Sequence, residues 1–150
     1  MRRGSILARA ALIAYALALA AIAVAEEAAR FQPIDIVVDV GAGALAAYQI
    51  ELVVTSGDAS IVGVEGGEPA AFKAAPYYDP KALAGGRIII AAYSIDDQLP
   101  SGRVRVATLH MREVGAAPGY EVKLLAAADS DGQPLSVTVE VQPRPVGGAR

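Results

Sequence analysis

The sequence predicts an all-β protein built from two packed antiparallel sheets. From about Gln32 onward, Val, Ile, Leu and Tyr recur at every second position in short runs, which is the side-chain period of β-strands. Gly, Pro, Asp and Ser separate these runs, and no helical repeat lies between them. About seven short strands without helices to cover a sheet favour a sandwich, in which each sheet buries the apolar face of the other.

An export signal is predicted before this domain. A basic start, MRR, is followed by the apolar run 10–25, and charge returns with two glutamates. Ala23 and Ala25 provide the small residues of an A-x-A cleavage site. The run is shorter than the roughly 18 residues that a membrane-spanning helix needs. We therefore expect residues 1–25 to be a signal peptide, and the mature protein to be periplasmic or extracellular and not membrane-spanning.

The composition excludes several classes of function. Without residues 1–25 the chain keeps ten basic residues against sixteen acidic ones, a formal charge of −6. Such a charge disfavours nucleic-acid binding, which needs clustered Lys and Arg. The absence of cysteine and the single histidine exclude disulfide scaffolds, zinc fingers and cysteine nucleophiles. We expect no cofactor and no metal site.

The predicted organisation is a single domain over 34–142, between a linker at 26–33 and a flexible tail at 143–150. Residues 66–86 are expected to be irregular, with a short helix over 69–75, because they contain three prolines and end in paired glycines. The expected strands are 34–40, 45–54, 60–65, 87–93, 104–114, 120–127 and 135–141.

The strand predicted over 104–114 changes its parity. Val104 and Val106 are apolar at even positions, whereas Ala107, Leu109 and Met111 are apolar at odd positions. One extra residue in a strand reverses the faces of all residues that follow it. We therefore predict a β-bulge near Val106.

The stretch AAYSIDDQLPSGRVRVATLHM contains every residue type of a Ser/His/Asp hydrolase. However, neither Ser94 nor Ser101 lies in a Gly-x-Ser-x-Gly elbow. Asp96 and Asp97 are neighbours in a loop, which does not hold two carboxylates at a defined separation. His110 lies between two apolar residues on the outward face of a strand, without a positioned partner. We interpret this stretch as strand, loop and strand, and the protein as not an enzyme.

Two other groups of residues have alternative interpretations. Asp129 and Asp131 begin like a calcium loop, but Gln133 and Pro134 interrupt the pattern, so we predict a hairpin turn and leave adventitious calcium binding open. Phe72, Tyr77 and Tyr78 lie in the irregular segment. We favour their packing in the core, because aromatic residues make up only 5% of the chain. Tyr77 and Tyr78 remain candidate residues for stacking on carbohydrate.

Outward-facing polar residues define a candidate protein-binding face. Gln49 and Glu51 on one predicted strand are expected to share it with Thr108, His110 and Arg112 on another. Arg112 would be the anchor of a modest polar interface, because arginine is enriched in binding hot spots. The alternative is a solvated surface with a cross-strand pair of Glu51 and Arg112.

Five segments, LAAYQIELVV, IVGVEGG, RIIIAAYS, GRVRVATL and ADSDG, follow one another in this order. In order and spacing, residues 34 to 141 resemble a cohesin domain. The resemblance implies a jelly-roll sandwich of about nine strands, related to some carbohydrate-binding modules and without enzymatic activity. It also implies that a dockerin docks on the outer face of one sheet, at positions that match Ala47, Gln49 and Glu51.

The resemblance indicates an exported bacterial binding module with a dockerin-like protein partner, linked to polysaccharide degradation. A carbohydrate-binding module is the alternative from a different class, because the same sandwich with exposed tyrosines could bind sugar. A structural protein of the cell envelope is a second alternative.

Overall fold

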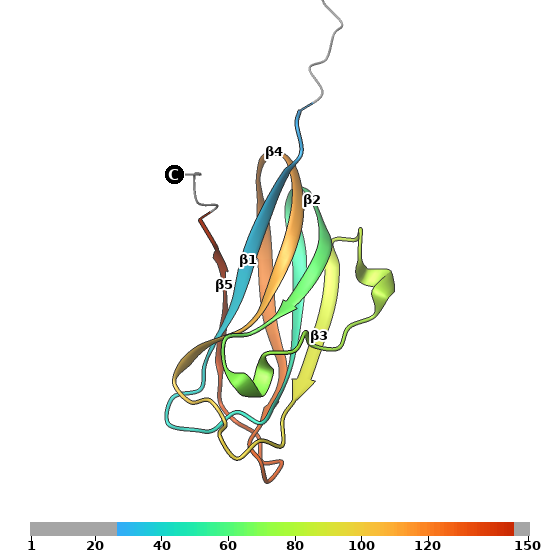
Figure 1. The fold of residues 1–150 in the computed structure, drawn as a ribbon. Coiled ribbons are helices and arrows are strands. Elements are labelled where there is room, and N and C mark those ends of the chain that lie inside the picture. Colours follow the sequence, from blue (N-terminus) through green and yellow to red (C-terminus); the bar gives the residue numbers. More distant parts are fainter. Residues whose placement is uncertain (1–26, 146–150) are drawn as a thin grey trace, which may run out of the picture.

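The computed structural model describes residues 27–145, which form one antiparallel sheet of five strands in the order β3-β2-β4-β1-β5 (Figure 1). The predicted all-β antiparallel class is confirmed. The signal peptide predicted for residues 1–25 lies outside the described residues. Two short 3-10 helices, η1 (Ala70–Phe72) and η2 (Pro80–Ala82), lie in the irregular connection from β2 to β3. The strands are β1 (Arg30–Asp39), β2 (Ala47–Gly66), β3 (Arg87–Tyr93), β4 (Arg103–Ala128) and β5 (Thr138–Pro143).

Two long strands take the place of four predicted ones. β2 covers most of the predicted strand 45–54 and all of 60–65, and β4 covers 104–114 and 120–127. Where turns were expected, the two strands stay paired and bend together. Ser56 lies opposite Gly119 and Asp58 opposite Val114, so β4 carries several extra residues opposite Gly57. Gly57 has a φ of +80°, which a residue with a side chain rarely adopts.

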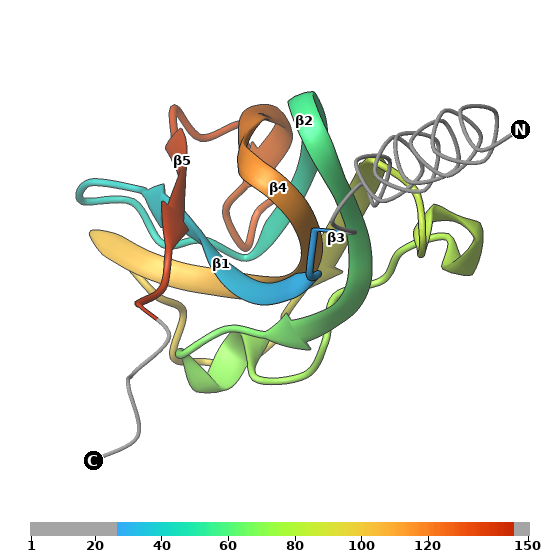
Figure 2. The same cartoon turned by 90° about the horizontal axis from the view of Figure 1, so that it is seen from above.

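The shared bend divides the sheet into two halves (Figures 1 and 2). We call β3 with residues 47–54 of β2 and 120–128 of β4 the β3 half. The β1 half consists of β1, β5, residues 58–66 of β2 and residues 103–114 of β4. Hydrogen bonding therefore describes one folded sheet of five strands, and not the separate sheets and seven to nine strands that were expected.

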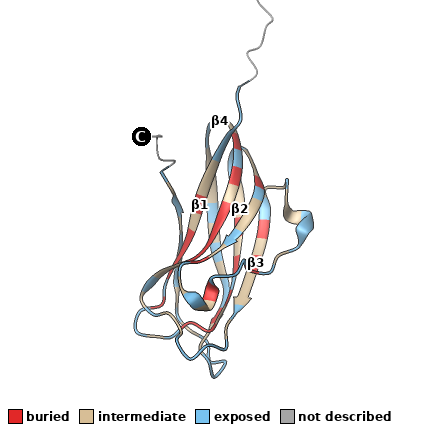
Figure 3. Cartoon of the chain, viewed as in Figure 1, coloured by how far each residue is buried: buried red, intermediate tan, exposed pale blue. Residues whose placement is uncertain are grey.

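The apolar faces of the two halves pack against each other. Tyr48 in the β3 half donates a hydrogen bond from its hydroxyl to the carbonyl of Val106 in the β1 half, at 3.2 Å. Its ring meets Phe72 edge to face, with centroids 5.2 Å apart. Buried positions recur along β1, β2, β3 and β4 (Figure 3). They include Ile50, Leu52, Ile88 and Ile90 from the β3 half, and Ile34, Ile36, Val38, Leu109 and Met111 from the β1 half.

The predicted bulge near Val106 is confirmed. Ile36 lies opposite Ala107 and Val37 opposite Arg105, which leaves Val106 as the extra residue on β4. Val106 and Ala107 are both fully buried. The bulge therefore allows consecutive side chains to face the core, as the change of parity in the sequence indicated.

Ion pairs and hydrogen bonds hold both ends of the described chain. Arg30, at the start of β1, lies 2.8 Å from the carboxylate of Glu113, which is only 4% exposed. Tyr120 donates its hydroxyl to the same carboxylate at 2.5 Å. Arg144, just after β5, donates its amide to the carbonyl of Pro33 at 3.0 Å. The strand region therefore includes part of the predicted linker at one end and reaches the predicted tail at the other.

Candidate functional site

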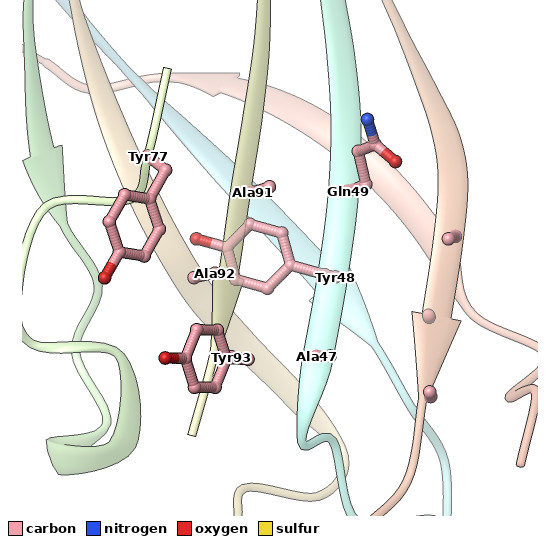
Figure 4. A pocket seen from close by; sticks show the side chains of 10 residues that line it. Ala47, Tyr48, Gln49, Tyr77, Ala91, Ala92 and Tyr93 are labelled. Carbon is pink, nitrogen blue, oxygen red and sulfur yellow. The ribbon is translucent and has the colours of Figure 1, made fainter. Parts of the chain in front are cut away.

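The outer surface of the β3 half contains an apolar groove of about 280 Å³ (Figure 4). Side chains alternate along each strand, so Tyr48 and Ile50 face the core while Ala47 and Gln49 face outward. Small side chains leave the groove shallow and its backbone accessible. Six of its ten lining residues are alanines, namely Ala47, Ala91, Ala92, Ala126, Ala127 and Ala128.

Two exposed tyrosines lie at one side of this groove. Tyr77 is 71% exposed and Tyr93 67% exposed. Their rings are nearly parallel, at 11°, with centroids 6.4 Å apart. At this separation neither ring covers the other, and Figure 4 shows them side by side. Tyr77 is fixed by two backbone hydrogen bonds with Ala91 of β3, at 2.7 and 2.9 Å, so both rings are held on ordered backbone.

A second hollow of about 530 Å³ continues the groove toward the loops. The two share Ala47, Tyr93 and Ala128 as lining residues. Among the residues that the structure describes, Asp96, Asp97 and Asp129 also line the second hollow, and no lysine or arginine does. The groove is thus apolar along the strands and acidic at the end where the loops lie.

The structure separates the predicted protein-binding residues into two groups. Gln49 and Glu51 lie on the β3 half, where they pair with Ala126 and Lys123 of β4. His110 and Arg112 lie on the β1 half, opposite Gly63 and Ser60 of β2. The prediction that these residues share one face is wrong. Both β2 and β4 bend, so the two ends of each strand belong to different halves, and the two halves pack against each other through their apolar faces.

The predicted pair of Glu51 and Arg112 is also wrong. Glu51 pairs instead with Arg87 on the neighbouring β3, with a guanidinium nitrogen 2.5 Å from its carboxylate. Arg87 lies at the start of β3, next to Glu51 across the sheet. Arg112 lies between Phe31 of β1 and Ser60 of β2, and it is exposed.

Thr108 is not a surface residue, contrary to the prediction. It is fully buried although it points to the outer side of the β1 half, because charged side chains cover it. Its hydroxyl donates to Asp35 at 2.8 Å and accepts from Arg105 and Arg144, both at 3.0 Å. Arg144 also binds the carboxylate of Asp35 through two nitrogens, at 2.5 and 3.2 Å. Thr108 therefore sits beneath a network of two guanidinium groups and one carboxylate.

A carboxylate lies close to the ring of His110. The ring Nε2 lies 3.1 Å from the carboxylate of Glu65, but without the alignment of a hydrogen bond. No hydrogen bond within residues 27–145 joins His110 to Ser94 or Ser101. Ser94 instead accepts the backbone amide of Asp96, as expected for a loop between strands. The structure does not bring together the candidate triad.

The aromatic residues of the irregular segment separate into buried and exposed ones. Phe72 is buried against Tyr48, and Tyr78 packs partly against the core. Tyr77 is exposed and lines the groove. Its neighbour Tyr93 was not among the predicted site residues. The signal was its parity on β3, which is opposite to that of the buried Ile88 and Ile90, so that Tyr93 faces outward.

Asp129 acts as the predicted turn residue. One oxygen of its carboxylate accepts the backbone amides of Asp131 at 3.0 Å and Gln133 at 2.8 Å. Gly132 has a φ of +78°, which completes the turn. Within the described part of the chain, no group of three or more His, Cys, Asp or Glu side chains is arranged to hold a metal ion.

Comparisons with models of protein families, with curated proteins and with solved structures give no match for this chain. Among residues 27–145, no helix has the length and apolar character needed to cross a membrane.

Proposed function

We propose that this chain is an exported, non-catalytic binding module with a protein partner, and that the alanine groove of the β3 half is its docking surface. The observation that carries the proposal is the alanine floor beside two exposed tyrosines. Exposed apolar surface of this kind is stabilised by burial against a partner. Tyrosine is also among the residues that dominate binding energy in protein interfaces.

The polarity of the groove favours protein over sugar. Sugar hydroxyl groups need hydrogen-bond partners when they leave water, and unpaired ones are costly. The lining offers few such groups, with Gln49 and the tyrosine hydroxyls the main ones. The alanines, in contrast, allow the backbone of a partner helix or strand to approach closely. In its specific form, the proposal is that the chain is a cohesin-like jelly-roll sandwich that binds a dockerin-like partner. The packing of the two halves of the folded sheet supports this form.

A substitution that fills the groove tests the proposal. Ala126 is exposed and lines the groove, so Ala126→Arg should block docking without disturbing the core. Ala116→Arg is the matched control, because Ala116 is exposed in the bend of β4. Immobilised wild-type protein and the control should retain the same partner from secreted fractions of the source cells, and Ala126→Arg should lose it. Equal retention by all three would show that the groove is not the docking surface.

A carbohydrate ligand is the second candidate function, favoured by the parallel rings of Tyr77 and Tyr93. Flat aromatic faces held side by side can stack on successive sugar rings. Affinity electrophoresis in gels with embedded polysaccharides tests this. Retardation that Tyr77→Ala and Tyr93→Ala abolish, and that Phe31→Ala on the β1 half preserves, would favour sugar over a protein partner.

A further inference from the structure

The β1 half carries a third hollow, of about 420 Å³, that differs in chemistry from the groove. Its lining includes three cationic side chains, Lys73, Arg105 and Arg144, and one acidic one, Glu65. Asp35, which lies beneath the two arginines, neutralises part of this charge. The five groups together keep one positive charge in excess, on a protein whose overall charge is negative.

The two arginines are held in fixed positions. Arg105 donates from Nη1 to the carbonyl of Gly66 at 3.1 Å and to Thr108. Arg144 donates from Nε and Nη2 to Asp35 and Thr108. Within the described residues, no hydrogen bond uses Nη2 of Arg105 or Nη1 of Arg144. A guanidinium group has five N–H donors, so each arginine keeps donors for a ligand while its other bonds hold it in place.

Gly66 and Gly67 bring the third cation to the same hollow. A Cβ atom on Gly66 would lie 2.1 Å from the carbonyl oxygen of Lys73, and one on Gly67 would lie 2.5 Å from that of Arg105. The absence of side chains therefore lets the segment after β2 fold closely over β4. Gly67 also donates its amide to the carbonyl of Phe72 at 2.7 Å, which closes the turn that presents Lys73.

From this arrangement we infer that the hollow between Lys73, Arg105 and Arg144 binds an anionic group, either a carboxylate, a sulfate or a phosphate. Prepositioned guanidinium donors bind such groups with short, charge-assisted hydrogen bonds. The hollow is larger than a bare ion, so it also accommodates a saccharide that carries the anionic group. Glu65 lines the same hollow, and its negative charge repels an anion and weakens its binding. The inference concerns the β1 half and does not depend on the proposed function of the groove.

Titration of the mature protein with defined anions tests the inference. The probes are sodium sulfate, sodium phosphate and sodium glucuronate, at constant ionic strength set with chloride, and glucose as the neutral counterpart of glucuronate. The readout is the shift of the backbone amide signals of Gly66, Gly67 and Arg105 in nitrogen-15 NMR spectra. We expect saturable shifts with at least one anion and none with glucose. Binding of glucuronate indicates a sugar acid as ligand, whereas binding of the inorganic anions alone indicates a free ion.

Three variants decide whether the hollow itself binds the anion. Lys73→Glu should weaken binding about threefold or more, since it replaces a positive charge by a negative one. Glu65→Gln should strengthen binding by a smaller factor, since it removes one negative charge. Lys81→Glu is the matched control, because Lys81 is exposed on η2 and does not line this hollow. The affinity of Lys81→Glu for the anion should differ less from that of the wild type than the affinity of Lys73→Glu does. The inference is wrong if no anion gives a saturable shift, or if Lys73→Glu and Lys81→Glu bind equally well.

Discussion

The hydroxyl of Tyr48 joins the two halves of the folded sheet, because it donates across the core to the carbonyl of Val106 at 3.2 Å. Val106 is the extra residue of the bulge in β4. Tyr48 is 3% exposed, so both groups of this hydrogen bond are removed from water. The ring of Tyr48 also packs edge to face against Phe72. The bond therefore fixes how the β3 half, which carries the groove, sits on the β1 half.

Tyr48→Phe should lower the free energy of unfolding by about 1–2 kcal/mol, because it leaves the buried carbonyl of Val106 without this donor. The aromatic packing is kept, so no large cavity forms. Urea unfolding followed by circular dichroism measures the change. Tyr78→Phe is the matched control, since Tyr78 is only partly buried and should lose less than about 0.5 kcal/mol. Equal losses in the two variants would contradict the role given to the bond with Val106.

Burial also raises the pKa of the Tyr48 phenol far above its ordinary value of 10.0. Above about pH 10 the unfolded chain loses this proton while the folded protein keeps it. The stabilisation is therefore complete below about pH 10 and is lost as the pH rises toward the folded pKa, by up to about 1.4 kcal/mol per pH unit. The advantage of wild type over Tyr48→Phe should narrow between about pH 10 and pH 11.5 in urea unfolding. A constant difference across this range would show that the phenol ionises equally in both states.

The alternation of side chains was enough to predict the strand class and several local features. β3 has the predicted bounds. The bulge at Val106 follows from the change in the parity of apolar positions between Val106 and Ala107. Asp129 closes the turn that its position before Gly132 indicated. These features depend on neighbouring residues alone, and local chemistry determines them.

The candidate face could not be predicted in the same way, because it depends on pairing between distant segments. Gly57 and the segment 114–119 both read as ends of strands, whereas the structure uses them as bends inside two continuous strands. This changes which half each outward residue belongs to, so Gln49 and Arg112 do not share a surface. Tyr93 joins Tyr77 only because the irregular segment returns to pair with β3. No local pattern contains that information.

Gly66 is expected to be among the glycines most sensitive to substitution. A Cβ atom there would lie 2.1 Å from the carbonyl oxygen of Lys73, so Gly66→Ala requires a shift of backbone and should cost about 2 kcal/mol or more. Gly63→Ala on the same strand is the control, because its Cβ would lie 3.7 Å from His110, an ordinary contact. Thermal unfolding should show a clearly lower midpoint for Gly66→Ala and little change for Gly63→Ala. Similar midpoints would show that the segment after β2 gives way easily.

The network of Asp35, Arg105 and Arg144 should act as a unit, because one carboxylate serves two guanidinium groups. Asp35→Asn removes the charge but keeps the shape, and it should lower stability by about 1–3 kcal/mol, since hydrogen bonds to charged groups are lost and two cations face each other. Arg144→Gln should then cost less in the Asp35→Asn background than in wild type, which a double-mutant cycle in urea measures.

The exposed pair of Arg103 and Glu140 supplies the comparison for this cycle. Its side chains are 48% and 46% exposed, so solvent screens the pair and Glu140→Gln should change stability by less than about 0.5 kcal/mol. Asp35 is 17% exposed and lies under the guanidinium groups, where screening is weaker. Additive effects of Asp35→Asn and Arg144→Gln would mean that the two side chains contribute independently. Arg144 would still be held through its backbone, which binds the carbonyl of Pro33 and the side-chain amide of Gln32.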